Sequence, residues 1–111
     1  MTFTHALEWL TPWYPVVDGY IGAGLERQLA VEISRRHVLF GETCRLIARR
    51  EDTDDALFAL PGGRVAEVHL TWSSRTEQDP RWPATAVFGS LEDWARDSMV
   101  PLHAELSELG R

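Results

Sequence analysis

Residues able to do acid–base chemistry occur together in one short alternating segment. Glu67, His69 and Thr71 are separated by Val68 and Leu70, so on a β-strand they would lie on one face. A histidine beside a carboxylate can act as a general base. The same pattern is also the ordinary product of a sheet with one solvated face. Both interpretations follow from the sequence.

A second histidine extends the possibilities to metal chemistry. His69, His103 and an acid such as Glu77 or Glu105 would suit zinc, but the chain has no H-x-x-H or C-x-x-C spacing. The set forms only if the C-terminus folds back over the strand. We therefore predict no metal site and no cofactor. A small hydrolase-like or metal-dependent enzyme that uses His69, Glu67 and His103 is the second functional hypothesis.

The remaining nucleophiles are weaker candidates. Cys44 is the single cysteine, so no disulfide can form within the chain. It lies in an alternating segment, where we expect it to be buried in a strand and to behave as a small hydrophobe. No serine lies in a Gly-x-Ser-x-Gly turn. The sequence therefore does not favour nucleophilic catalysis.

Tryptophans beside an acidic loop favour binding over catalysis. The chain has five tryptophans, and Trp72 and Trp82 flank a polar loop that contains Glu77 and Asp79. Aromatic rings beside carboxylates suit a protein partner that places an Arg or Lys over a ring. Alternatively, Trp72 and Trp82 pack on each other and anchor the loop. These four residues are the predicted binding residues.

A predicted β-hairpin over residues 56–72 positions most of these side chains. Apolar residues fall on even numbers both before and after residues 61–63, and cross-strand partners share a face, so the loop must have an odd length. Pro61-Gly62-Gly63 meets this requirement. The predicted pairs are Leu60–Arg64, Phe58–Ala66 and Ala56–Val68. The alternation also places Leu70 and Trp72 on the core face, with His69 and Thr71 on the other.

Other segments are predicted to cover this hairpin. Residues 1–17 form an aromatic arm interrupted by prolines. Residues 18–36 form an amphipathic helix, capped by Asp18, with apolar residues every four positions. The further predicted elements are a half-buried strand at 42–50, a short edge strand at 84–88 and helical pieces over 90–109, which begin at Ser90 and are ended or kinked at Pro101.

Together these elements predict a single small α+β domain over residues 1–111. Its antiparallel sheet has three to four strands and is centred on the hairpin 56–72. The N-terminal helix and the C-terminal helices are predicted to pack on one face of this sheet, because an alternating sheet has one apolar face to bury.

Composition and charge exclude several classes of function. The chain has 17 acidic residues against 11 basic ones, all of them arginine, and a net charge of −6. Such a chain repels a phosphate backbone, and no basic stripe is present, so we expect no nucleic-acid partner. It has neither a signal-like opening nor an apolar run long enough to span a membrane. We expect a cytoplasmic protein with no membrane partner.

Several stretches of the chain resemble a family of small, uncharacterised bacterial proteins. The likeness lies in HVLFG, RREDTDDALFAL, GRVAEVHLTW, a later WP and an EDW, and it covers roughly residues 29–105. This resemblance implies no catalytic residue. By size and charge, the chain is also similar to immunity proteins and mobile-cassette products. The leading hypothesis is a non-enzymatic protein-interaction module that binds a protein partner or a second copy of itself.

Overall fold

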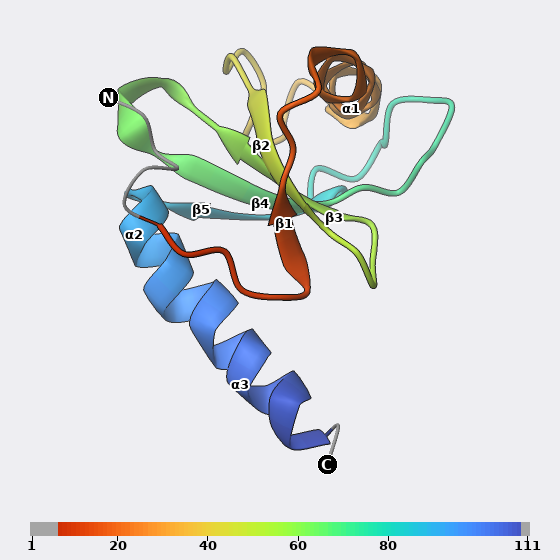
Figure 1. The fold of residues 1–111 in the computed structure, drawn as a ribbon. Coiled ribbons are helices and arrows are strands. Elements are labelled where there is room, and N and C mark those ends of the chain that lie inside the picture. The colour runs from red at the N-terminus through yellow and green to blue at the C-terminus, as the bar shows by residue number, and fades with distance from the viewer. Residues whose placement is uncertain (1–6, 110–111) are drawn as a thin grey trace.

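A five-stranded antiparallel sheet forms the centre of the molecule in the computed structural model, which describes residues 7–109. The strands lie side by side in chain order (Figure 1). They are β1 (Trp13–Pro15), β2 (Arg45–Arg50), β3 (Asp55–Ala59), β4 (Val65–His69) and β5 (Ala84–Phe88). The fold is therefore α+β, with more strands than the three to four predicted.

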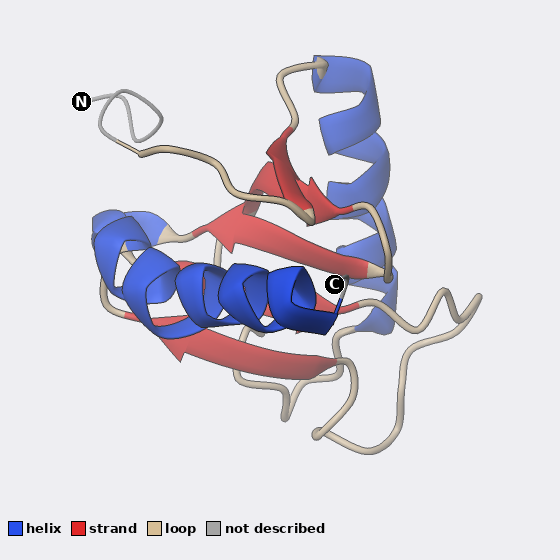
Figure 2. Cartoon of the chain, turned by 60° about the horizontal axis from the view of Figure 1, so that its bottom comes forward, coloured by secondary structure: helices blue, strands red, loops and turns tan. Residues whose placement is uncertain are grey.

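Helices cover both faces of the sheet. Helix α1 (Gly19–Glu32) connects β1 to β2, and a C-terminal helix runs through α2 (Leu91–Trp94), a π-helical turn (Ala95–Met99) and α3 (Val100–Leu109). In Figure 2 the C-terminal helix crosses in front of the sheet and α1 stands behind it. The prediction that all helices pack on one face is wrong.

Two apolar clusters, one on each face, explain this arrangement. The even-numbered residues of β3 and β4 pack against Leu25 and Leu29 of α1. The odd-numbered Leu57 and Val65 pack on the other face, with Trp94 of the C-terminal helix among their neighbours. The face that carries the odd-numbered residues of β3 and β4 therefore also has apolar side chains to bury, although polar residues lie among them.

The predicted hairpin register is confirmed. Phe58 pairs with Ala66 and Ala56 pairs with Val68 in the β3–β4 ladder. The Leu60 amide donates to the Arg64 carbonyl across 2.9 Å, which closes the three-residue loop. Glycine meets the loop's backbone requirement, since φ is 80° at Gly62 and 81° at Gly63.

The predicted edge strand at 84–88 is also confirmed, and β5 pairs with β4 along its whole length. The prediction missed β1, which lies inside the arm expected at 1–17, of which residues 1–6 fall outside the described part. Trp13 of β1 is buried, and its ring meets the ring of Trp94 edge to face at 5.1 Å. Pro15 is the last residue of β1, a position that tolerates proline because the strand is at an edge.

Side-chain caps begin both long helices as predicted. The Asp18 carboxylate accepts a hydrogen bond from the Tyr20 amide at 2.8 Å, and the Ser90 hydroxyl accepts one from the Asp93 amide at 3.0 Å. Pro101 does not end the C-terminal helix. It is the second residue of α3, and a π-helical turn (Ala95–Met99) immediately precedes α3 in the continuous helix. Among residues 7–109, no helix combines the length and apolarity needed to cross a membrane.

Candidate functional site

A buried carboxylate fixes the start of the loop between β4 and β5. Glu32, the last residue of α1, is fully buried. Its carboxylate accepts hydrogen bonds from the Thr71 amide (2.8 Å), the Thr71 hydroxyl (3.0 Å), the Trp72 amide (2.9 Å) and the Gln28 side chain (2.6 Å). A buried carboxylate needs such partners, since an unpaired one is very costly. These bonds determine the path of the chain at Thr71 and Trp72.

Trp72 has a left-handed backbone and an exposed side chain. Its φ is +58°, and within 7–109 it is the only non-glycine residue with a positive φ. The residue is 48% exposed. This conformation costs roughly 1–2 kcal/mol for a residue with a Cβ. The prediction that Trp72 lies on the core face is wrong, because β4 ends at His69 and the alternation does not continue through the turn toward Glu32.

The rest of the loop is tied to the C-terminal half of α1 and the segment that follows it. The Thr76 hydroxyl donates to the Val31 carbonyl at 2.8 Å, and the Glu77 amide donates to the Glu32 carbonyl at 3.0 Å. His37, which is buried, bonds through Nε2 to the Pro83 carbonyl at 2.9 Å. The loop from Thr71 to Pro83 is thus held at several points along its length.

The charges around this loop differ from the expected acidic surroundings. Asp79 forms an ion pair with Arg81 at 2.6 Å. Hydrogen bonds from the Arg81 side chain and amide lower the pKa of Asp79 to about 2, and nearby Arg36 contributes to the shift. Arg36 is exposed, and so are Arg35 and Arg75. The carboxylate predicted to attract a basic partner is therefore already neutralised within the chain.

We call the exposed side chains of this region the Trp–Arg surface. It consists of Trp72, Trp82, Arg35, Arg36 and Arg75. Trp82 is 45% exposed, and the two tryptophans flank the same end of the β4–β5 hairpin, whose last pair is His69 with Ala84. Of the predicted binding residues, both tryptophans are at the surface, whereas Glu77 and Asp79 are half-buried.

The three predicted catalytic residues do not form one hydrogen-bonded set. His69 binds the carboxylate of Asp55 through Nδ1, across the β3–β4 ladder. Glu67 instead accepts hydrogen bonds from Trp94 Nε1 at 2.8 Å and Ser98 Oγ at 2.6 Å, both on the C-terminal helix. Glu67 and His69 line one open hollow of about 270 Å³. Within it, Glu67 holds the helix to the sheet and does not orient His69.

His103 lies in a different hollow. Its Nδ1 is 2.7 Å from the Thr11 carbonyl oxygen, and the surrounding residues include Glu51 and Asp52. Glu105 is exposed on α3. Residues 7–109 contain no group of three or more His, Cys, Asp or Glu side chains able to hold a metal ion. The arrangement gives no support to the zinc alternative.

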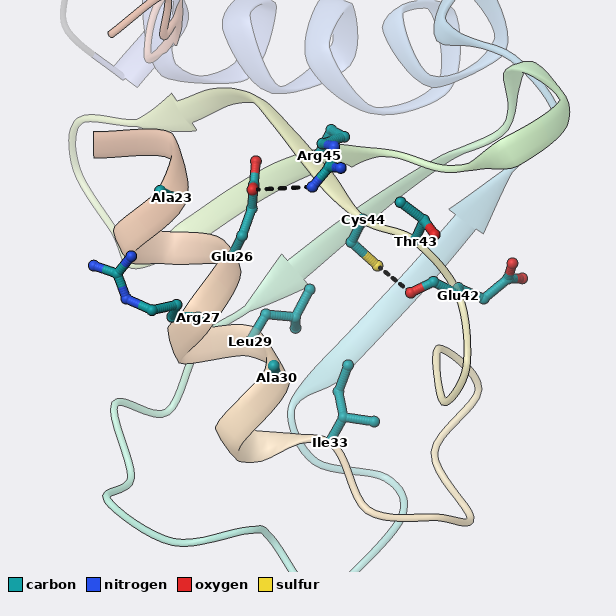
Figure 3. A pocket seen from close by; sticks show the side chains of 10 residues that line it. All are labelled: Ala23, Glu26, Arg27, Leu29, Ala30, Ile33, Glu42, Thr43, Cys44 and Arg45. Carbon is teal, nitrogen blue, oxygen red and sulfur yellow. Dashed lines mark hydrogen bonds and ion pairs between the residues drawn. The ribbon is translucent and has the colours of Figure 1, made fainter. Parts of the chain in front are cut away.

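Cys44 lies in a groove of about 370 Å³ between α1 and the segment that leads into β2 (Figure 3). It was predicted to be buried in a strand, but it is half-buried and precedes β2. Burial raises the pKa of its thiol to about 11, and the carboxylates of Glu42 and Glu26 add to this. The thiol is therefore protonated at neutral pH and is a poor nucleophile.

Sequence reasoning missed Glu32 and Asp55, which organise the loop and the His69 side chain. Glu32 had a usable signal, since it follows Leu25 and Leu29 by seven and three residues and so falls on the buried face of its helix. Asp55 is the last of four acids in the segment 51–55, and nothing in their spacing distinguishes it from the others. No protein-family model, curated protein or solved structure matches the chain.

Proposed function

We propose that this chain is a protein-binding domain and that the Trp–Arg surface is its contact surface. The observation that carries the proposal is Trp72, whose half-exposed indole stands on a strained backbone held by the buried Glu32. The hydrogen bond to Glu32 offsets the cost of the left-handed backbone, but an exposed indole stabilises the fold little, so the monomer alone does not require a tryptophan at this position. Strained residues held by their surroundings cluster at binding and active sites.

The partner that fits this surface is a protein segment with acidic and apolar side chains. Arginines bind carboxylates in a bidentate geometry, and tryptophan and arginine are the residues most enriched at the centres of interfaces. The chain as a whole carries a charge of −6 and would repel an acidic partner. However, salt screens charges beyond about 8 Å at physiological ionic strength, so the local arginines decide the contact.

A random peptide library displayed on phage tests this proposal against the full chain. Enriched peptides, synthesised and titrated by calorimetry, should be acidic. Trp72→Ala should weaken their binding at least about tenfold, as expected for a central aromatic contact. Arg75→Gln should weaken it and make it less sensitive to salt, because it removes a screened attraction.

Two variants elsewhere on the molecule serve as matched controls. Tyr20→Ala removes an exposed aromatic residue at the other end of α1, and Arg96→Gln removes an exposed arginine on the C-terminal helix. Both should bind the selected peptides like the unmodified chain. Equal binding by Trp72→Ala, enrichment of basic peptides, or tight binding of a labelled single-stranded oligonucleotide would each overturn the proposal.

The pairing of His69 with Asp55 supports a second candidate, a small hydrolase-like enzyme. A carboxylate on Nδ1 orients an imidazole and leaves Nε2 free to accept a proton. Hydrolysis of p-nitrophenyl acetate tests this candidate. Activity that His69→Ala abolishes and Trp72→Ala leaves unchanged would favour the enzyme over the binding domain.

A further inference from the structure

The two edges of the sheet are built differently. β1 has three residues, ends at Pro15 and pairs only with the last three residues of β2. Before that point, the Leu46 amide of β2 donates to the Glu26 carboxylate at 2.9 Å, and Glu26 also pairs with Arg45 at 3.5 Å. A short strand, a proline and charged side chains are the usual ways to keep an edge from pairing with another strand.

The other edge, formed by β5, has none of these features. β5 pairs with β4 over five consecutive residues and without a bulge, and it ends the strand order of the sheet (Figure 1). No proline lies within it, and no charged residue occurs from Trp82 to Leu91. Its outward-facing backbone groups are therefore available to a further strand.

Exposed apolar side chains lie along the same edge. Segment 37–42 follows β5 on the α1 side, since His37 bonds to the Pro83 carbonyl at one end and Glu42 bonds to Arg64 at the other. Arg64 precedes Val65, which pairs with Phe88. The exposed residues are Val38 (62%), Phe40 (55%) and, within β5, Val87 (41%). They extend the apolar surface beyond the strand itself.

The side chains of β5 complement a second copy of β5. In an antiparallel pair centred on Ala86, the one large side chain, Phe88, meets an alanine, the two β-branched side chains meet each other, and no charges face each other. The pairs are Ala84 with Phe88, Thr85 with Val87, and Ala86 with its own counterpart. Ala84 and Ala86 line the open hollow beside Glu67 and His69, so space is present where Phe88 of the second copy would lie.

We propose that β5 pairs antiparallel with β5 of a second copy of this chain, which makes one continuous ten-stranded sheet. Such a pair has two-fold symmetry, the commonest symmetry of soluble dimers. Two chains of charge −6 repel each other, and the β5 edge lets them meet without bringing charges together. The contact is small, so we expect a dimer that dissociates on dilution. The proposal does not depend on the Trp–Arg surface.

Sedimentation and light scattering of the full chain test the proposal over about three orders of magnitude in concentration. The mass should rise from that of one chain, 12.6 kDa, towards twice that value. Val87→Lys should shift the dissociation to at least about tenfold higher concentration, because two lysines per dimer then lie at the shared edge. Trp72→Ala should dimerise like the unmodified chain. A monomer at every concentration overturns the proposal.

Disulfide crosslinking tests the register in a Cys44→Ser background. Ala86→Cys places two thiols directly opposite each other, where cross-strand Cβ atoms are close enough for a disulfide. It should crosslink about tenfold faster than Ala104→Cys, which places an exposed thiol on α3. A dimer that crosslinks equally at both positions, or that Val87→Lys leaves unchanged, uses another surface and also overturns the proposal.

Discussion

At the scale of single residues, the backbone of Trp72 gives a direct test of the strain on which the proposed function depends. A residue with a Cβ is disfavoured at φ +58°, whereas glycine is not. We therefore expect Trp72→Gly to be more stable than Trp72→Ala by about 1 kcal/mol, although glycine is usually the more destabilising substitution. Urea unfolding followed by circular dichroism measures both variants.

The exposed Trp82 supplies the control for this comparison. No positive φ occurs at Trp82, so Trp82→Gly should be less stable than Trp82→Ala. If glycine is the worse residue at both positions, the left-handed conformation of Trp72 carries no strain. The main support for the Trp–Arg surface would then be lost.

Cys44 gives a second prediction at this scale, and it depends on pH. A thiol with a pKa of about 11 holds far less thiolate at pH 8 than an ordinary cysteine, so alkylation by iodoacetamide should be about a hundredfold slower than that of free cysteine. The rate should rise about tenfold per pH unit up to pH 10, since only the thiolate reacts. Mass spectrometry measures the modified fraction. The urea-unfolded chain should react at the ordinary rate, and fast alkylation of the folded chain would contradict the burial.

At the scale of elements, the sequence predicted the features that depend only on residues close together in the chain. The hairpin register followed from alternation and an odd loop length, and the helix caps followed from Asp18 and Ser90. It failed where a distant residue decides the conformation. Trp72 points outward because Glu32, forty residues earlier, binds its amide. Likewise, β1 was missed because Pro15 counts against a strand until the strand is known to be at an edge.

The face on which the C-terminal helix packs was mispredicted for a similar reason. Leu57 and Val65 alone do not mark the odd face as apolar, and the buried Trp13 and Trp94 that complete its core come from the two ends of the chain. For the site, the sequence named both tryptophans as binding candidates, although its alternation placed Trp72 on the core face. It did not identify Arg35 and Arg36, because the segment after α1 and the 71–83 loop meet only in the folded chain.

The glycines of two different elements should respond oppositely to alanine. Gly62 in the β3–β4 loop has φ 80°, so Gly62→Ala should destabilise the chain by about 1 kcal/mol. Gly24 lies within α1, where an added Cβ would meet only the Arg27 side chain at 4.0 Å, so Gly24→Ala should stabilise it by about 0.5–1 kcal/mol. Thermal unfolding compares both variants with the unmodified chain. A loss of stability in Gly24→Ala would mean that α1 needs its glycine for close packing.

At the scale of the whole molecule, the sheet stands between two apolar clusters that do not share side chains. Leu29 belongs to the cluster on the α1 face, while Trp13 and Trp94 belong to the cluster on the other face. The middle strands contribute residues to both clusters, so neither layer can remain folded without the strands that the other also needs. We therefore expect the molecule to unfold in one cooperative transition.

Leu29→Ala tests this coupling across the sheet. It should cost about 2–5 kcal/mol, the range for a truncated core leucine. In a Trp72→Phe, Trp82→Phe background, emission comes from the remaining tryptophans, of which Trp13 and Trp94 are buried on the face opposite Leu29. Their fluorescence midpoint in urea should fall by the same amount as the circular dichroism midpoint. If the fluorescence midpoint stays in place while the circular dichroism midpoint falls, the two faces unfold separately. In that case α1 can detach, together with the loop that it holds through Glu32, while the rest of the sheet stays folded.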